Sequence, residues 1–225
     1  MNIVLSVAFI ALFCIDYYFM YSDTIKRNPE LTEKQRAHIL SIKASTTLFL
    51  ISIYFNYKFI KSGFDVNLYT SSLSTNDNFV LDLAVFNLIS YLITDCYVGY
   101  HKYHKYMCTL SGYTHHIAYT FISIIALYIN VPGFYFLFMI EELPTIFLGT
   151  GNYNKGLRRD NVFGLTFFLT RLLYHGYLTW KFSFNKVFMF FGMLSFGLHS
   201  YWFKNWVSKY FLKTNRKDVK DVKQE

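Results

Sequence analysis

The sequence predicts an all-α fold, a polytopic bundle of about seven transmembrane helices. Hydrophobic residues make up 53% of the 225 residues, and 21% of the chain is aromatic. These residues gather in repeated runs of about 18–22, which is the length of helix that crosses a bilayer. The runs are apolar on all sides rather than along one stripe, which argues against a soluble protein built from amphipathic helices.

Seven apolar runs follow one another along the chain, and each is expected to form one transmembrane helix. They cover residues 3–21, 39–60, 79–100, 112–131, 134–149, 162–180 and 187–206. The second and fifth are the least regular, because Lys43 interrupts the second and the fifth is short. Since no linker rich in proline or glycine divides the chain, we expect an N-terminal span and loop (1–34), one transmembrane domain (35–208) and a basic cytosolic tail (209–225).

The first run has the position of a cleaved signal peptide. No Lys or Arg precedes Lys26, however, and the run is longer than the apolar core of a signal peptide, so we expect an uncleaved helix. Four cations follow the run between Lys26 and Arg36, which predicts an N-terminus outside the cytosol.

The positive charges are distributed as membrane topology requires. With seven crossings and a cytosolic C-terminus, the cytosolic connections carry 16 Lys and Arg residues and the opposite side carries 4. The cytosolic connections are then 22–38, 101–111, 150–161 and 204–225. The net charge of +8 therefore reflects topology, and nucleic acid is not expected as a partner.

Ionisable side chains inside the runs are the candidates for function, because placing them in hydrocarbon is costly. The third run carries Asp95 near its cytosolic end, and His115 and His116 begin the fourth run. A short basic loop joins these two runs, so Asp95 could meet the histidines. Thr120 lies one helical turn after His116 and extends the same polar face. The alternative is that the histidines lie at a helix end among lipid headgroups.

The last three runs also carry ionisable groups. Glu141 and Glu142 precede Pro144, which should kink the helix and leave the carbonyl of Ile140 without its usual partner. Arg171 is the only arginine inside a run, so we expect it to pair with Glu142, although such a pair could be purely structural. The groups predict a polar cavity open to the cytosol, with a lining that includes Thr120, Glu141, Arg171 and His199.

The order of these residues resembles the TLC-domain family of membrane proteins over roughly residues 34–209. Asp95 ends one span, the histidine pair opens the next, and Glu142-Leu-Pro-Thr-Ile-Phe147 marks the one after. The resemblance implies a lipid-related function in the endoplasmic reticulum or a related endomembrane. The family's ceramide synthases transfer an acyl group from coenzyme A to a sphingoid amine and carry an Asp-x-x-Asp element. This chain has Glu141-Glu142-Leu-Pro144 there, and it looks more like the compact members of the family.

Three functions remain open on these observations. The first is lipid metabolism, sensing or trafficking, in which either histidine of the pair, oriented by Asp95 or Glu142, would serve as base or nucleophile for acyl transfer from acyl-coenzyme A. The second is a non-catalytic lipid sensor, cargo receptor or assembly factor. The third is a metal-dependent lipid oxidase or hydrolase, for which the seven histidines are few and poorly spaced. We expect membrane lipids as partners, allow for a homo- or hetero-oligomer within the membrane, and expect no metal and no resident cofactor.

Overall fold

The computed structural model describes residues 3–107 and 109–221 of the chain. All regular structure in these residues is helical, which confirms the predicted all-α class. The chain divides into two compact units, one formed by Met1–Arg158 and the other by Arg159–Glu225. No linker rich in proline or glycine marks this division, and the sequence did not predict it.

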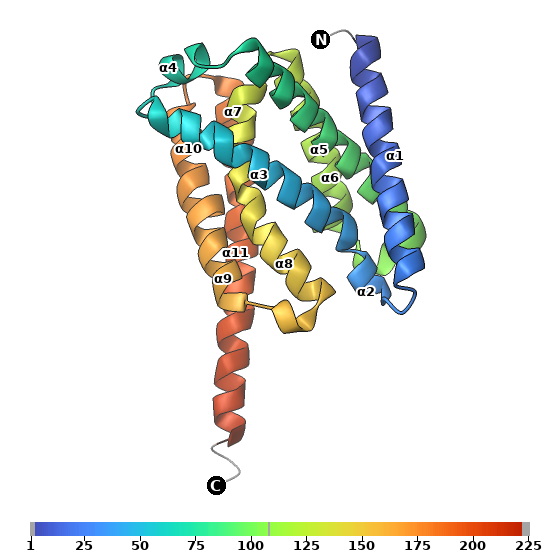
Figure 1. The fold of residues 1–225 in the computed structure, drawn as a ribbon. Helices are drawn as coiled ribbons and strands as arrows, with labels where there is room; N and C mark the ends of the chain where they lie inside the picture. The colour runs from blue at the N-terminus through green and yellow to red at the C-terminus, as the bar shows by residue number, and fades with distance from the viewer. Residues whose placement is uncertain (1–2, 108, 222–225) are drawn as a thin grey trace. The chain divides into compact units, whose positions relative to one another are not determined.

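The first unit is built from helices of 11 to 28 residues and from several shorter segments. In order these are α1 (Ile3–Arg27), α2 (Glu33–Arg36), α3 (Ile39–Lys61), α4 (Val66–Ser71), α5 (Thr75–Lys102), η1 (His104–Tyr106), η2 (Thr109–Thr114), α6 (His115–Tyr128), α7 (Pro132–Leu137), η3 (Phe138–Glu142), α8 (Leu143–Tyr153) and η4 (Lys155–Leu157). The long helices pack side by side, with α1 and α6 against α5, and with α3 against α5 and α8 (Figure 1).

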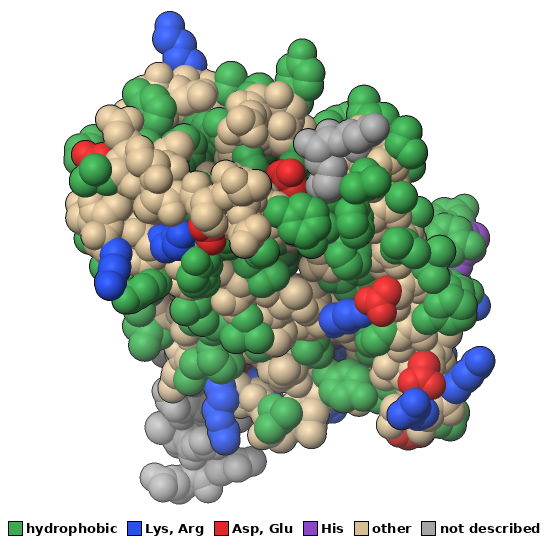
Figure 2. Space-filling model, turned by 45° about the horizontal axis from the view of Figure 1, so that its top comes forward, with side chains coloured by type: hydrophobic (Ala, Val, Ile, Leu, Met, Phe, Trp, Pro, Cys, Tyr) green, Lys and Arg blue, Asp and Glu red, His purple; other side chains and the backbone are tan. Residues whose placement is uncertain are grey.

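Within the described residues, three helical stretches are long and apolar enough to cross a membrane, and they span Ile3–Arg27, Glu33–Lys61 and Thr75–Lys102. Only 6% of the most apolar stretch of α1 is buried. The side chains of Ile3 and Phe19 in this helix are 80% and 67% exposed. Such exposure suits contact with hydrocarbon better than contact with water. Figure 2 shows hydrophobic side chains over much of the visible surface. The structure thus supports a membrane location, and the number of crossings stays a prediction.

Lys43, which interrupts the second apolar run, is compensated in the structure. Its ammonium group forms an ion pair with Asp16 of α1 and lies 4.6 Å from the centre of the Tyr17 ring. An opposite charge and an aromatic face both offset the cost of placing an ammonium group beside apolar side chains. The lysine therefore ties α3 to α1 without breaking the helix.

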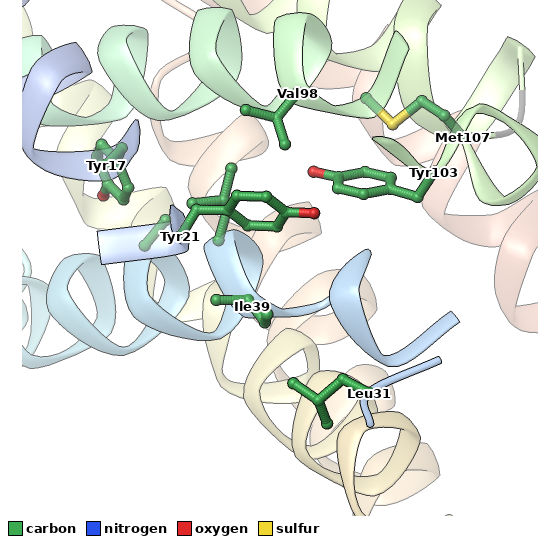
Figure 3. Packing of buried hydrophobic residues seen from close by; sticks show 9 residues of the cluster. Tyr17, Tyr21, Leu31, Ile39, Val98, Tyr103 and Met107 are labelled. Carbon is green, nitrogen blue, oxygen red and sulfur yellow. The ribbon is translucent and has the colours of Figure 1, made fainter. Parts of the chain in front are cut away.

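A buried cluster closes the end of the first unit where α1, α3 and α5 meet. Figure 3 shows Tyr17 and Tyr21 of α1 gathered with Ile39 of α3 and Val98 of α5. Tyr103, the residue directly after α5, completes the cluster, and its ring centre lies 6.1 Å from that of Tyr21. Since Tyr103 is 1% exposed, the cluster fixes the position of its hydroxyl group.

Three of the segments that depart from α-helical hydrogen bonding contain, or lead directly into, candidate polar residues. The π-helical segment η2 leads into His115, and the π-helical segment η5 (Phe168–Tyr174) contains Arg171. The third segment, η3, is a 3₁₀ helix in which the amide of Leu143 donates to the carbonyl of Ile140. The prediction that this carbonyl lacks a partner was wrong, because the tighter turn before Pro144 supplies a donor that an α-helix would not.

The second unit is a helical hairpin. The first arm of the hairpin consists of α9 (Asp160–Phe167), η5 and α10 (His175–Lys181). The second arm, α11 (Lys186–Asp221), packs along the first. Thus α11 continues past the seventh apolar run into the expected tail, of which residues 222–225 lie outside the described residues.

Two glycines allow the two arms of the hairpin to approach each other closely. A Cβ atom at Gly164 of α9 would lie 2.1 Å from the ring of Trp206 in α11. A Cβ atom at Gly192 of α11 would lie 2.7 Å from the hydroxyl oxygen of Thr179 in α10. Both distances are shorter than van der Waals contact, so each neighbour occupies the space that a side chain would need.

Candidate functional site

The first unit brings together three of the polar groups near the end of α5. Nδ1 of His116 lies 3.5 Å from Oδ2 of Asp95, and the hydroxyl of Tyr103 donates a hydrogen bond to Oδ1 of the same carboxylate. The three side chains are 6%, 4% and 1% exposed in the order His116, Asp95 and Tyr103. The predicted meeting of Asp95 with the histidine pair is therefore present, and His116 is the histidine that makes it.

The Tyr91 ring and the backbone of Leu92 lie beside His116. The Tyr91 ring, one helical turn before Asp95 on α5, has its centre 5.4 Å from the centre of the imidazole. The His116 ring also lies within hydrogen-bonding reach of the backbone of Leu92. The Asp95 carboxylate beside Nδ1 and the Tyr91 ring restrict the orientation of the imidazole.

The electrostatics of this pair suit an apolar environment. One proton shared between the carboxyl group of Asp95 and the imidazole of His116 leaves the pair without net charge, whichever group carries it. A net-neutral pair costs far less to bury than a single charge, and the bond from Tyr103 satisfies a further lone pair of the carboxylate. The arrangement can hold one proton, or release one, at a fixed position inside the helical bundle.

His115 has different surroundings from its neighbour. It is half-buried, and its ring centre lies 4.3 Å from that of Tyr119 on the next turn. Because η2 and α6 form one continuous helical column from Thr109 onward, both histidines lie beyond the first turn of that column. The two imidazole rings lie 5.6 Å apart between their centres, but their other neighbours differ, with Asp95 beside His116 and Tyr119 beside His115.

The polar face that continues beyond His116 is occupied by bonds within the protein. The hydroxyl of Thr120 donates to the carbonyl of His116 at 2.8 Å, and the hydroxyl of Ser123 donates to the carbonyl of Tyr119 at 2.7 Å. Ser123 also lies 3.0 Å from the hydroxyl of Tyr135 on α7. Thr120 therefore keeps lone pairs to accept a hydrogen bond, while its proton is already engaged.

The two glutamates of the fifth run lie on η3. Glu141 is 6% exposed, whereas Glu142 is half-buried. The segment η3 packs against α3, α7 and α8. Direct contact of Glu142 with the histidines stays a prediction.

In the second unit, polar side chains from the two arms of the hairpin also lie close together. Nε2 of His175 lies 2.8 Å from the carbonyl oxygen of Gly192, and its ring centre is 5.1 Å from that of His199. Arg171 lies over the Phe167 ring with its guanidinium carbon 5.3 Å from the centroid. His199 is 2% exposed. The predicted partner of Arg171, Glu142, belongs to the first unit, and that ion pair stays a prediction.

Sequence reasoning missed two features of the first unit. One is Tyr103, whose distance of eight residues from Asp95 gave no helical signal because α5 ends between them. The other is a network at the opposite end of α5, where the buried carboxylate of Asp77 accepts from Lys58 at 2.7 Å and from the exposed Tyr54 at 3.0 Å. The pattern Ser74-x-x-Asp77, which forms a capping box in the structure, was the available signal.

Comparisons with known proteins add nothing to the description of this site. No family model, no curated protein and no solved structure matches the chain. The resemblance to the TLC-domain family therefore stays a prediction. For metal binding, Asp95 and His116 together offer two ligand groups, whereas a zinc site takes three or four from the protein.

Proposed function

We propose that the protein is a lipid-handling membrane protein of the endoplasmic reticulum or a related endomembrane, with seven crossings. The observation that carries the lipid-handling function is the Asp95–His116–Tyr103 group inside apolar helices. Burying ionisable side chains there costs free energy, and such groups in membranes mark polar substrate or proton sites more often than structural ones. The order of residues that resembles TLC-domain proteins supports the same assignment.

The seven crossings are supported by more than the three long helices. The remaining four apolar runs coincide with the helical segments α6, α7 to α8, α9 to α10 and α11. The charge split of 16 to 4 favours a non-cytosolic N-terminus and a cytosolic C-terminus. An odd number of crossings follows from that arrangement of the termini.

Within this function, a polar lipid headgroup or a reacting amine would interact with His116. The carboxylate of Asp95 orients the imidazole and would stabilise its protonated form after proton uptake. That role suits an acyltransferase that uses acyl-coenzyme A and takes a proton from the attacking group. It equally suits a sensor or carrier that binds a headgroup without changing it, so reaction and binding need separate measurements.

The test is lipid analysis of cells that lack the protein and are complemented with single variants. His116→Ala should reproduce the lipid profile of the deletion. Because breaking the buried pair also lowers stability, wild type and variant are compared at matched amounts of folded protein. His104→Ala is the matched control, since that histidine is exposed and bonds to Tyr113 in the connection after α5. A His116→Ala protein of normal abundance that restores the full profile would remove the pair from the function.

A second measurement separates an enzyme from a binding protein. Membranes containing wild-type protein are incubated with labelled acyl-coenzyme A and a sphingoid amine, and the amide product is quantified. Product that requires both His116 and Asp95 would establish acyl transfer. A lipid phenotype without product would favour the sensor or carrier.

A further inference from the structure

A groove lined mostly by polar residues lies in the first unit, and none of its lining residues belongs to the Asp95–His116–Tyr103 group. Its volume is about 920 Å³, which is within the usual size of a small-molecule site. The walls come from residues 28–35, from Tyr106 of η1 and from residues 151–158. These three stretches belong to three of the predicted cytosolic connections. The fold therefore brings together, in one groove, segments that are far apart in the sequence.

The ionisable groups of the groove are mostly basic. Lys34, Lys155 and Arg158 line it, and Glu30 is the single carboxylate among its lining residues. All four residues are exposed to solvent. Neither lysine forms an ion pair with another residue in the described part of the chain. The groove therefore presents an excess of positive charge to whatever enters it.

Hydrogen bonds fix one wall of the groove against the other. Nε2 of Gln35 donates to the carbonyl of Tyr153 at 2.8 Å and so joins α2 to the end of α8. Nε of Arg36 donates to the carbonyl of Leu31 at 2.8 Å, which holds the turn before α2. Leu31 itself is buried in the cluster of Figure 3. A wall held in this way loses little conformational entropy when a ligand binds.

A glycine determines where Arg158 lies. A Cβ atom at Gly151 of α8 would be 3.0 Å from the Cα atom of Arg158. The loop after α8 can therefore fold back onto the helix because position 151 has no side chain. This close approach places the backbone of Arg158 on the same groove as Lys155.

We propose that this groove binds a phosphate group, carried either by the headgroup of a membrane lipid or by a soluble phosphorylated compound. Arginine supplies paired donors that match phosphate oxygens, and lysine supplies compact positive charge. The side-chain amides of Asn28 and Asn152 also line the groove and add neutral polar groups. The inference goes beyond the lipid-handling function and shares no residue with the Asp95–His116–Tyr103 group.

The experiment uses the full chain purified in dodecyl maltoside, a detergent without phosphate, and measures the thermal unfolding midpoint. In the soluble arm, inorganic phosphate is compared with chloride at equal ionic strength. In the lipid arm, micelles with phosphatidic acid are compared with micelles containing the matching diacylglycerol, which lacks only the phosphate. The midpoint should rise with phosphate in at least one arm, and the arm that responds identifies the source of the group.

The variants Lys155→Gln with Arg158→Gln, and separately Lys34→Gln with Lys155→Gln, remove two charges from the groove. Each pair should weaken the apparent affinity by about tenfold or more, as expected for the loss of charge-assisted bonds. The control, Lys26→Gln with Arg27→Gln, removes two exposed charges outside the groove lining and should respond as the wild type does. No response of the wild type in either arm, or an equal loss in the control, would overturn the proposal.

Discussion

Replacing Gly164 by Ala should destabilise the second unit by a steric effect that does not depend on the surrounding lipid. The new methyl group would lie 2.1 Å from the nearest carbon of the Trp206 ring and within 2.8 Å of two more. The ring is held by its neighbours, with centroids 5.6 Å from that of Phe163 and 5.9 Å from that of Phe203. It cannot swing aside without breaking these contacts, so the helices must separate.

The size of the effect follows from two opposing contributions. Forcing an extra methyl group into a packed contact costs about 1–3 kcal/mol, and the short distance at Trp206 points to the upper end. Alanine also favours the helix over glycine by about 1 kcal/mol. The free energy of unfolding should therefore fall by about 2 kcal/mol, which corresponds to a decrease of about 4–8 °C in the unfolding midpoint for a chain of this size.

Thermal unfolding in detergent measures this decrease. Gly197→Ala is the matched control, because no atom lies within 4 Å of a Cβ atom placed there, and its midpoint should stay equal or rise. In a Trp206→Leu background the cost of Gly164→Ala should largely disappear, since the clashing ring is gone. A Gly164→Ala protein as stable as wild type, or one with the same loss in both backgrounds, would refute the reasoning.

Three further predictions concern the polar groups and the topology. Asp95→Asn or His116→Gln alone should lower the unfolding midpoint, because breaking a buried pair costs about 3–5 kcal/mol, and the double variant should regain part of the loss. Strictly additive losses would show that the two side chains do not interact. Glu142→Gln and Arg171→Gln should likewise each lower the folded yield in membranes, and their combination should restore part of it if the predicted ion pair forms. Finally, a C-terminal tag on sealed microsomes should be digested by added protease and an N-terminal tag protected, and a protected C-terminal tag would contradict the seven-crossing topology.

Part of the candidate site was accessible from local sequence alone. Asp95 and His116 lie on either side of a short connection, so two antiparallel helices had to bring them to similar depth. The choice between His115 and His116 was not accessible, because it depends on the rotation of α6 about its axis. That rotation follows from the π-helical turn in η2 and from packing against Tyr91. Likewise, Tyr103 reaches Asp95 because the chain turns sharply after α5.

A helical protein suited to a membrane could be predicted from the sequence, because run length and hydrophobicity act locally along the chain. The same local patterns identified the costly charges inside the apolar runs. Which of these charges meet depends on tertiary structure. Lys43 of α3 forms an ion pair with Asp16 of α1, and Asp95 of α5 accepts a hydrogen bond from Tyr103, which lies beyond the end of that helix. Tertiary structure also brings loops more than a hundred residues apart into one basic groove. Such contacts depend on helix rotation and side-chain volume, which no periodicity in the sequence records.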